Sequence, residues 1–426
     1  MKGREDKTIA PPAPPAAPAA ASARMLAPAL RNTGILIVAL GVVGGAWYWR
    51  QPAKEGRPPE REMTRRFKSD PGPWGDLEYV PIVIETPDEF LSVTRQANYE
   101  SLWTFQQFSP AQLHSLFKGA GLAPVEEAWL QDEHHWQAST NGVVISPPPE
   151  LVLSLNRVAR EKIYNTLAQC GGNALHEMPM THRLAGFDDW FKHSGLSSNT
   201  IAMTKSLLYQ RGNAWCLSDW PVILRQIESP AEQHRLLKTV SRQSTLLGRI
   251  RVNRDTDVEK LVSYWGRGGR SKDIRALLES LTRVENGATL DIVHLLPRFV
   301  RARLYTYPFP ANSPSTRTPN CFWTSMNFFS NQNPTDRFHD PETMLKVLEK
   351  DYFPVEESYL LGDVLLLSKP DGSLVHAAVF IADDVVLTKN GAHHTQPWML
   401  AQMDDLAASY PSVTPLKMRA FRRKDL

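Results

Sequence analysis

The feature that most constrains this chain is a change of hydrophobic period near Tyr305. An apolar run over residues 320–329 has the character of a helix and follows a loop rich in Pro, Ser and Thr. Strands are predicted for four short apolar stretches that follow, at residues 360–367, 375–381, 385–388 and 416–421. A helix followed by sequential strands predicts an α+β domain in which the helix packs on an antiparallel β-meander.

Cys321 stands at the start of the predicted helix. Asn320 precedes it and is a residue type that commonly caps helices, so Cys321 is expected in the first turn. Free amides and the helix dipole at that end favour a thiolate and are expected to lower the pKa of Cys321. Backbone N–H groups at the same end could hold an oxyanion, and Asn320 belongs to this predicted oxyanion and substrate region.

His376 opens the second predicted strand. A base on a rigid strand that faces a cysteine helix suits nucleophilic thiol catalysis, so we predict Cys321 as nucleophile and His376 as base. A third polar group should orient the imidazole, and Asn390, at the end of the third strand, is predicted for this role. The alternatives for the third position are Thr388, His393 and His394.

The order of these residues resembles that of the NlpC-type cell-wall peptidases, which have a papain-like fold. The resemblance starts near Tyr305 and includes Cys321, then Gly362-Asp363, then His376 and Asn390. Tyr307, with Tyr305 as the alternative, matches a tyrosine that this family carries ahead of its cysteine. The sequence departs from the family at Asn-Cys-Phe, where Asp-Cys-Ser is usual, and at His-Ala-Ala, where His-Val-Gly is usual.

The resemblance implies a thiol hydrolase that cleaves an amide bond in peptidoglycan peptide through an acyl-enzyme on Cys321. It implies neither a metal nor another cofactor. Two other functions stay open. One is acyl transfer, or hydrolysis of a thioester or lipid, on the same fold. The other is a non-catalytic scaffold that binds a partner at a membrane.

The middle of the chain is predicted to be a mostly helical domain. Ser109 and Ser229 each precede a Pro-Ala pair and a Gln or Glu, a pattern typical of helix N-termini. Thr86 precedes Pro-Asp-Glu and predicts a third helix start, with a further helix at 272–283. The apolar pair Leu246-Leu247 is read as part of the helix that begins after Ser229. Only residues 79–84 and 143–145 suggest strands.

The N-terminal region contains seventeen uncharged residues at 33–49, bracketed by Arg31 and Arg50 and ending in Trp-Tyr-Trp. This length and the terminal aromatic residues predict a single transmembrane anchor. More basic residues follow the segment than precede it, which favours a cytoplasmic location for the chain after residue 49. Long domains are translocated largely regardless of charge, however, and we therefore predict a single-pass protein of a bacterial inner membrane with its bulk in the periplasm.

Composition bounds the remaining possibilities. The chain has 426 residues, a net charge of +3 and three cysteines. Three cysteines cannot form a disulfide framework, and so small a net charge without a basic motif predicts no nucleic-acid partner. The expected partners are the membrane, through residues 33–49, and peptidoglycan. The predicted parts are a disordered Pro/Ala-rich tail (1–32), the anchor (33–49), a charged linker (50–72), the mostly helical domain (73–300) and the cysteine hydrolase domain (301–426).

Overall fold

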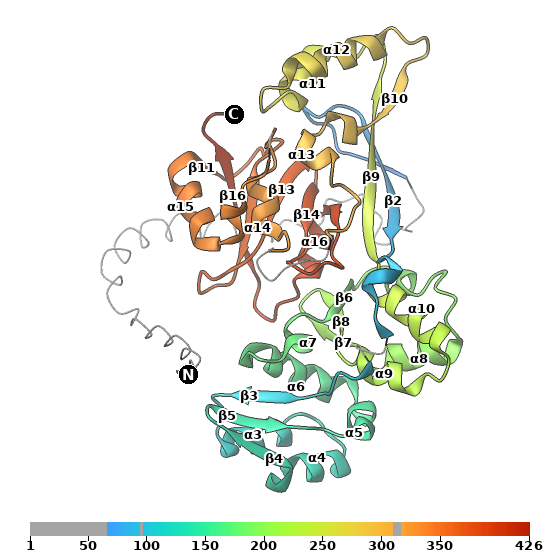
Figure 1. Ribbon diagram of the computed structural model, residues 1–426, viewed down its shortest axis with the longest axis vertical. Coiled ribbons are helices and arrows are strands. Elements are labelled where there is room, and N and C mark those ends of the chain that lie inside the picture. The colour runs from blue at the N-terminus through green and yellow to red at the C-terminus, as the bar shows by residue number, and fades with distance from the viewer. Residues whose placement is uncertain (1–65, 94–96, 310–316, 332) are drawn as a thin grey trace, which may run out of the picture. The chain divides into compact units, whose positions relative to one another are not determined.

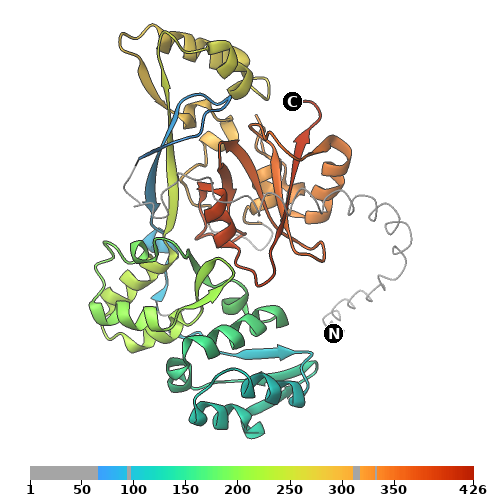
Figure 2. The same ribbon diagram turned by 180° about the vertical axis from the view of Figure 1, so that it is seen from behind.

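A computed structural model describes residues 66–93, 97–309, 317–331 and 333–426. These residues form an α+β structure with four antiparallel sheets (Figures 1 and 2). None of the helices within these ranges combines the length and apolar character needed to cross a membrane, and the predicted anchor at 33–49 lies outside them. The predicted fold class is therefore corrected: sheets and helices are mixed along the described chain, and a transmembrane helix is not supported.

The middle of the chain contains two small sheets and part of a third. One small sheet has the order β3 (Trp103–Gln106), β5 (Gly142–Ile145), β4 (Trp136–Ser139). The other has the order β6 (Met180–Arg183), β8 (Ala214–Leu217), β7 (Tyr209–Arg211). The α-helices around them are α3 (Pro110–Lys118), α4 (Pro124–Gln131), α5 (Pro149–Ser154), α6 (Arg157–Cys170), α7 (Ala174–Glu177), α8 (Ser198–Ser206), α9 (Trp220–Gln226) and α10 (Pro230–Ser241).

The third sheet is longer and crosses the middle of the chain. It has the order β1 (Phe67–Lys68), β2 (Leu77–Ile84), β9 (Gln243–Val252), β10 (Ala288–Asp291). Between β9 and residue 301, the α-helices are α11 (Val258–Trp265), α12 (Ser271–Thr282) and α13 (Arg298–Arg301). The prediction of a mostly helical middle was wrong, because most of its strands have only three or four residues and are too short to show a period of two.

Two of the three predicted helix starts are confirmed. The Ser109 and Ser229 side chains accept hydrogen bonds from the backbone amides three residues later, and Pro occupies the first position of α3 and α10. The start predicted at Thr86 gives only a single 3-10 turn at Asp88–Phe90. Leu246 was wrongly placed in a helix: α10 ends at Ser241, and β9 begins two residues later with an alternating pattern of burial.

Strand β9 connects the middle of the chain to its C-terminal sheet. The Thr245 hydroxyl donates to the Leu400 carbonyl at 2.8 Å and accepts from the Leu400 amide at 3.1 Å. One hydrophobic core contains Ile250 from β9, Trp323 from α14 (Cys321–Met326) and Leu400 from β15 (Trp398–Gln402). This core therefore continues across residue 300.

The C-terminal sheet has six strands and carries helices on both faces. Its order is β11 (Tyr352–Val355), β16 (Lys417–Arg423), β12 (Val364–Ser368), β13 (Leu374–Ala382), β14 (Val385–Lys389), β15. Helices α14 and α15 (Pro341–Asp351) pack with Val364 and Leu366, whereas α16 (Met403–Ser409) packs with the intervening Leu365 and Leu367. Three of the four predicted strands form the meander β12 to β14, whereas the fourth, predicted at 416–421, is β16 and pairs with β12 and β11. Strands β11 and β15 were not revealed by the sequence.

The Gly362-Asp363 pair that enters β12 has a structural role. Gly362 has a φ of +93°, and a Cβ atom at this position would lie 2.2 Å from the Phe329 ring. The buried Asp363 carboxylate accepts from the Leu360 amide at 2.8 Å and from two nitrogens of Arg422 at 2.9 and 2.7 Å. These contacts fix the turn that brings the chain into the centre of the sheet.

Replacement of Gly362 by alanine is expected to destabilise the protein by about 2–4 kcal/mol, because it adds backbone strain at a positive φ to a clash with Phe329. Urea unfolding followed by tryptophan fluorescence measures this loss. Gly372 is a suitable control: it also has a positive φ, +89°, but a Cβ there would meet no atom within 4 Å. Equal losses for the two variants would contradict a specific role for the Phe329 contact.

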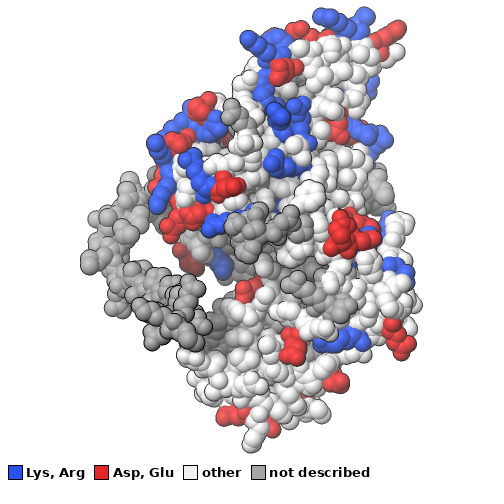
Figure 3. Space-filling view, viewed as in Figure 1, with Lys and Arg blue, Asp and Glu red and all other residues white. Residues whose placement is uncertain are grey.

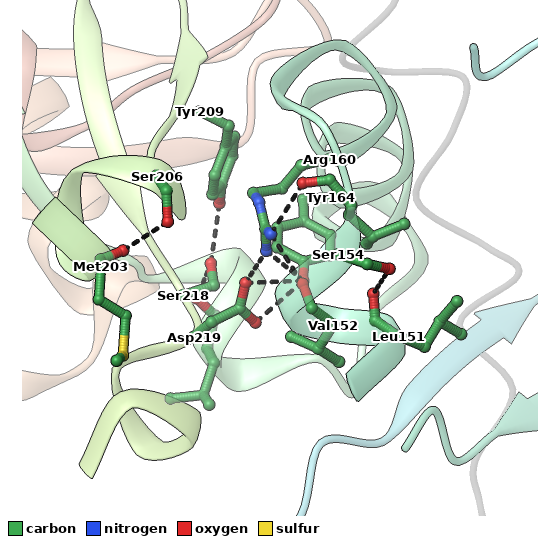
Figure 4. A network of polar contacts seen from close by, with 12 residues as sticks. Leu151, Val152, Ser154, Arg160, Tyr164, Met203, Ser206, Tyr209, Ser218 and Asp219 are labelled. Carbon is green, nitrogen blue, oxygen red and sulfur yellow. Dashed lines mark hydrogen bonds and ion pairs between the residues drawn. The ribbon is translucent and has the colours of Figure 1, made fainter. Parts of the chain in front are cut away.

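A buried polar network joins α6 to the start of α9 (Figure 4). The fully buried Arg160 guanidinium pairs with the Asp219 carboxylate and donates to the carbonyls of Val152 and Leu155. The Tyr164 hydroxyl donates to Asp219 at 2.8 and 2.9 Å. All three side chains are committed to one another or to the backbone, so we assign this cluster to stability.

Charged side chains of both signs are interspersed on the upper part of the face in Figure 3. Arg275 of α12 pairs with both carboxylate oxygens of Glu259 in α11, and Arg423 pairs with both oxygens of Asp425. Exposed pairs of this kind contribute roughly 0–1 kcal/mol each to stability. They balance local charge but add little to the free energy of unfolding.

Candidate active site

Helix α14 places Cys321 as predicted at its first residue. The Asn320 side chain accepts a hydrogen bond from the Trp323 amide at 2.8 Å and so caps the helix. Its amide group also donates to the His339 carbonyl at 3.2 Å. Asn320 thus serves the helix start, and Cys321 lies behind it with only 5% of its surface exposed.

His376 lies in β13 and is completely buried. Its Nε2 is 2.8 Å from the Thr388 hydroxyl in β14, and that hydroxyl donates to the Asn390 side-chain oxygen at 3.0 Å. A hydroxyl has one proton, so if Thr388 gives it to Asn390, Nε2 must be the donor toward Thr388. The same arrangement leaves Nδ1 without a proton, and Nδ1 is buried without a hydrogen-bond partner.

The sulfur of Cys321 is close to the backbone that follows His376. The amide of Ala377 faces this sulfur, and the ladder between β13 and β14 begins only at Val379 and Leu387. Helix α14 packs against both β13 and β14 (Figure 1). The Cys321 and His376 side chains are not hydrogen-bonded to each other in the described structure.

Two further side chains complete the candidate site. The Tyr410 ring, just after α16, stacks on the His376 ring with centroids 4.3 Å apart. Burial, and secondly the proximity of Cys321, raise the pKa of Tyr410 well above its usual value, whereas the Gly391 backbone acts in the opposite direction. Lys389, at the end of β14, is fully buried and interacts electrostatically with both Cys321 and His376.

Burial decides the resting protonation of this site. It raises the pKa of Cys321 to about 11, although the amides of Ala377, Phe322 and Cys321 and the charge of Lys389 act in the opposite direction. Burial also lowers the pKa of His376 to about 3, and Lys389 lowers it further. The expected low pKa of Cys321 is therefore not found, because loss of water outweighs a helix start of one and a half turns. At rest the thiol and the imidazole are both neutral, and they lie on opposite sides of β13. Cys321 packs with Leu366 and Ala377, whereas His376 pairs with Leu367 on the side of α16.

The other predicted site residues lie at varying distances from this centre. Asn390 reaches His376 only through Thr388, so Thr388 occupies the orienting position directly. The Tyr307 ring packs against Phe90 with centroids 6.2 Å apart, and Tyr305 donates through its hydroxyl to the Leu246 carbonyl. Within the described part of the chain, neither tyrosine hydrogen-bonds or stacks with Cys321 or His376. His393 and His394 stack on each other outside the described His376 contacts.

Sequence reasoning missed Lys389 and Tyr410. Lys389 ends a predicted strand, where an exposed lysine is ordinary, and only the observed burial separates it from a surface residue. Tyr410 belongs to the segment between β15 and β16, far from Cys321 in the chain. Within the part of the chain that the structure describes, no three His, Cys, Asp or Glu side chains converge in a way that could hold a metal ion.

Comparison with known proteins identifies no relative. No protein-family model matches the chain, and neither the curated proteins nor the solved structures contain a significant match. Similarity therefore assigns no family to the chain.

Proposed function

We propose that this protein is a thiol hydrolase that cleaves an amide bond through an acyl-enzyme on Cys321. The observation that supports this most is the position of Cys321 at the capped first turn of α14, where its sulfur faces the Ala377 amide and interacts electrostatically with Lys389. Nucleophilic thiol catalysis also requires an oriented base, the role proposed for His376, and the His376 ring must reach the sulfur from the other side of β13 to serve in it.

In the proposed reaction, Nδ1 of His376 takes the thiol proton as the sulfur attacks the substrate carbonyl. A carbon–sulfur bond forms, the amide carbon–nitrogen bond breaks, and the leaving amine receives the proton from His376. Water then hydrolyses the thioester and restores the thiol. In the resting structure Thr388 accepts from Nε2 and so orients the ring.

The burial of Cys321 and His376 adds one requirement. Both side chains are almost inaccessible in the resting structure, so substrate binding must open the site before the carbonyl can reach the sulfur. Catalytic hydrogen bonds also often tighten only when substrate is bound. The neutral resting thiol is consistent with a nucleophile that is activated during the reaction and is protected from oxidation before it.

Peptide crosslinks of peptidoglycan are the substrate that we propose first. The order of Cys321, Gly362-Asp363 and His376 resembles that of the NlpC-type peptidases, and the observed cysteine helix on an antiparallel sheet is the plan expected of such a domain. The altered residues around Cys321 make the substrate a separate question from the chemistry. Acyl transfer, or hydrolysis of thioesters or lipids, would use the same nucleophile.

The test is to incubate the full-length protein with purified cell wall, and separately with acyl thioesters, and to follow the products by mass spectrometry. Cys321→Ala is expected to abolish release of peptide fragments. Cys216→Ala is the matched control, since Cys216 is equally buried but lies in β8. Retained activity in Cys321→Ala would refute the proposal, and turnover of thioesters alone would favour the second activity.

A further inference from the structure

Lys389 is a buried lysine that the reaction above does not use. Its ammonium donates to the carbonyls of Gly391 at 2.9 Å and His393 at 3.1 Å, and lies 5.8 Å from the centre of the Trp398 ring. No acidic side chain among the described residues forms an ion pair with it. A buried cation without a carboxylate is costly, and a buried ionisable group next to a candidate site is a candidate for a functional role.

The ionisable groups around Lys389 come from three elements that pack near β14. Cys321 at the start of α14 and His376 in β13 interact with Lys389 directly, and Tyr410 after α16 interacts with Cys321. Of these, the thiol of Cys321 is the group on which the proposed reaction creates negative charge. Trp398, which lies under the Lys389 ammonium, donates to Thr324 in α14 at 3.0 Å and so ties this part of the sheet to the cysteine helix.

We infer that Lys389 is the electrostatic partner of Cys321 and stabilises its thiolate. The inference deepens the proposed function, on which it rests, by adding a fixed positive charge to the thiol and the imidazole. The thiol proton still passes to His376, and Lys389 keeps its own proton, so no bond to Lys389 forms or breaks. The two backbone carbonyls hold the ammonium in place, which keeps the charge near the sulfur without a competing carboxylate.

The test compares the rate at which iodoacetamide alkylates Cys321 in the wild-type full-length protein, in Lys389→Met and in Lys389→Arg, at pH values from 5.5 to 10. Burial lowers the pKa of Lys389 to about 7, whereas Cys321 acts in the opposite direction. Below that pH the lysine is charged. If this charge lowers the pKa of the Cys321 thiol by one unit, the wild-type protein is expected to be alkylated about tenfold faster than Lys389→Met. The advantage should shrink above pH 7, as Lys389 loses its proton.

Lys389→Arg separates charge from packing, since arginine stays protonated at all these pH values. Above pH 7, Lys389→Arg is expected to be alkylated faster than Lys389→Met, whereas the wild-type protein loses this difference in rate. A difference in access to the sulfur would change the rate by the same factor at every pH. If Lys389→Met does not fold, as judged by near-ultraviolet circular dichroism, Lys389→Gln replaces it, because its side-chain amide can still donate to a carbonyl.

Identical pH profiles for wild type and the neutral variant would overturn the role of Lys389 and leave the hydrolase proposal intact. Alkylation does not require turnover, so the reverse case is also distinguishable. If the profiles differ as expected but Cys321→Ala still cleaves the substrate, the electrostatic pair stands and the proposed function falls.

Discussion

Replacement of Asp219 by alanine is expected to lower the free energy of unfolding by about 3–5 kcal/mol, because it leaves the Arg160 guanidinium buried without a counter-charge. Arg160 has no exposed surface, and Asp219 is only 3% exposed. The Tyr164 hydroxyl would lose its acceptor in the same step. Urea unfolding of the full-length protein, followed by circular dichroism, measures the change.

Two further variants show whether the loss comes from the buried pair. Asp188 forms an exposed pair with Lys205, so Asp188→Ala is expected to cost less than about 1 kcal/mol. The double variant Arg160→Met/Asp219→Ala removes both charges and should recover part of the loss, since an apolar replacement of a buried ion pair is often tolerated. A double variant less stable than Asp219→Ala would argue against an unpaired guanidinium as the cause.

Replacement of His376 by asparagine is expected to reduce kcat by about 10²–10⁴-fold, the usual contribution of a general base. Thr388→Val keeps the shape of the side chain but removes the acceptor of the Nε2 proton, so we expect a smaller loss of kcat with little change in KM. Asn390→Ala acts one hydrogen bond further away and should have the smallest effect. Steady-state kinetics on the substrate identified for the wild-type protein provide the measurement.

His134→Ala provides the matched control for this series, because His134 lies on the surface of the middle region with its side chain 94% exposed. Its kinetics should equal those of wild type. A His376→Asn variant that kept full activity, while Cys321→Ala lost it, would mean that another group accepts the thiol proton. Lys389 would then be the first candidate, and the alkylation profile already separates its charged and neutral forms.

The sequence predicted the parts of the fold that have strong local signals. Ser109 and Ser229 start helices because their side chains cap the first free amides. Residues 375–381 form a strand because a continuous apolar run suits a strand buried on both faces. Short strands such as β6 and β7 have no such signal, and their existence depends on partners distant in the chain. Leu246 illustrates this, since its apolar neighbours fit a helix equally well until β2 and β15 are present.

The candidate site was predicted unevenly for a related reason. Cys321 and His376 could be chosen because their positions at a helix start and a strand start are local features. The protonation of Cys321 could not be predicted, because it depends on how much water reaches the sulfur. Asn390 was preferred over Thr388 for its place at the end of the third predicted strand, and only the contacts between β13 and β14 show which of them touches the ring. Tyr410 lies against His376 only because the chain returns to the sheet after α16.

The contact between β9 and β15 has a consequence for how this chain can be divided. Thr245 bonds both backbone groups of Leu400, and the core around Ile250 and Trp323 is built from residues on both sides of position 300. A fragment that began at 301 would expose its own part of that core, including Trp323 and Leu400, to water. The catalytic proposal therefore concerns an inseparable pair of sheets, and any transplant of the thiol site into another scaffold would have to carry β2 and β9 with it.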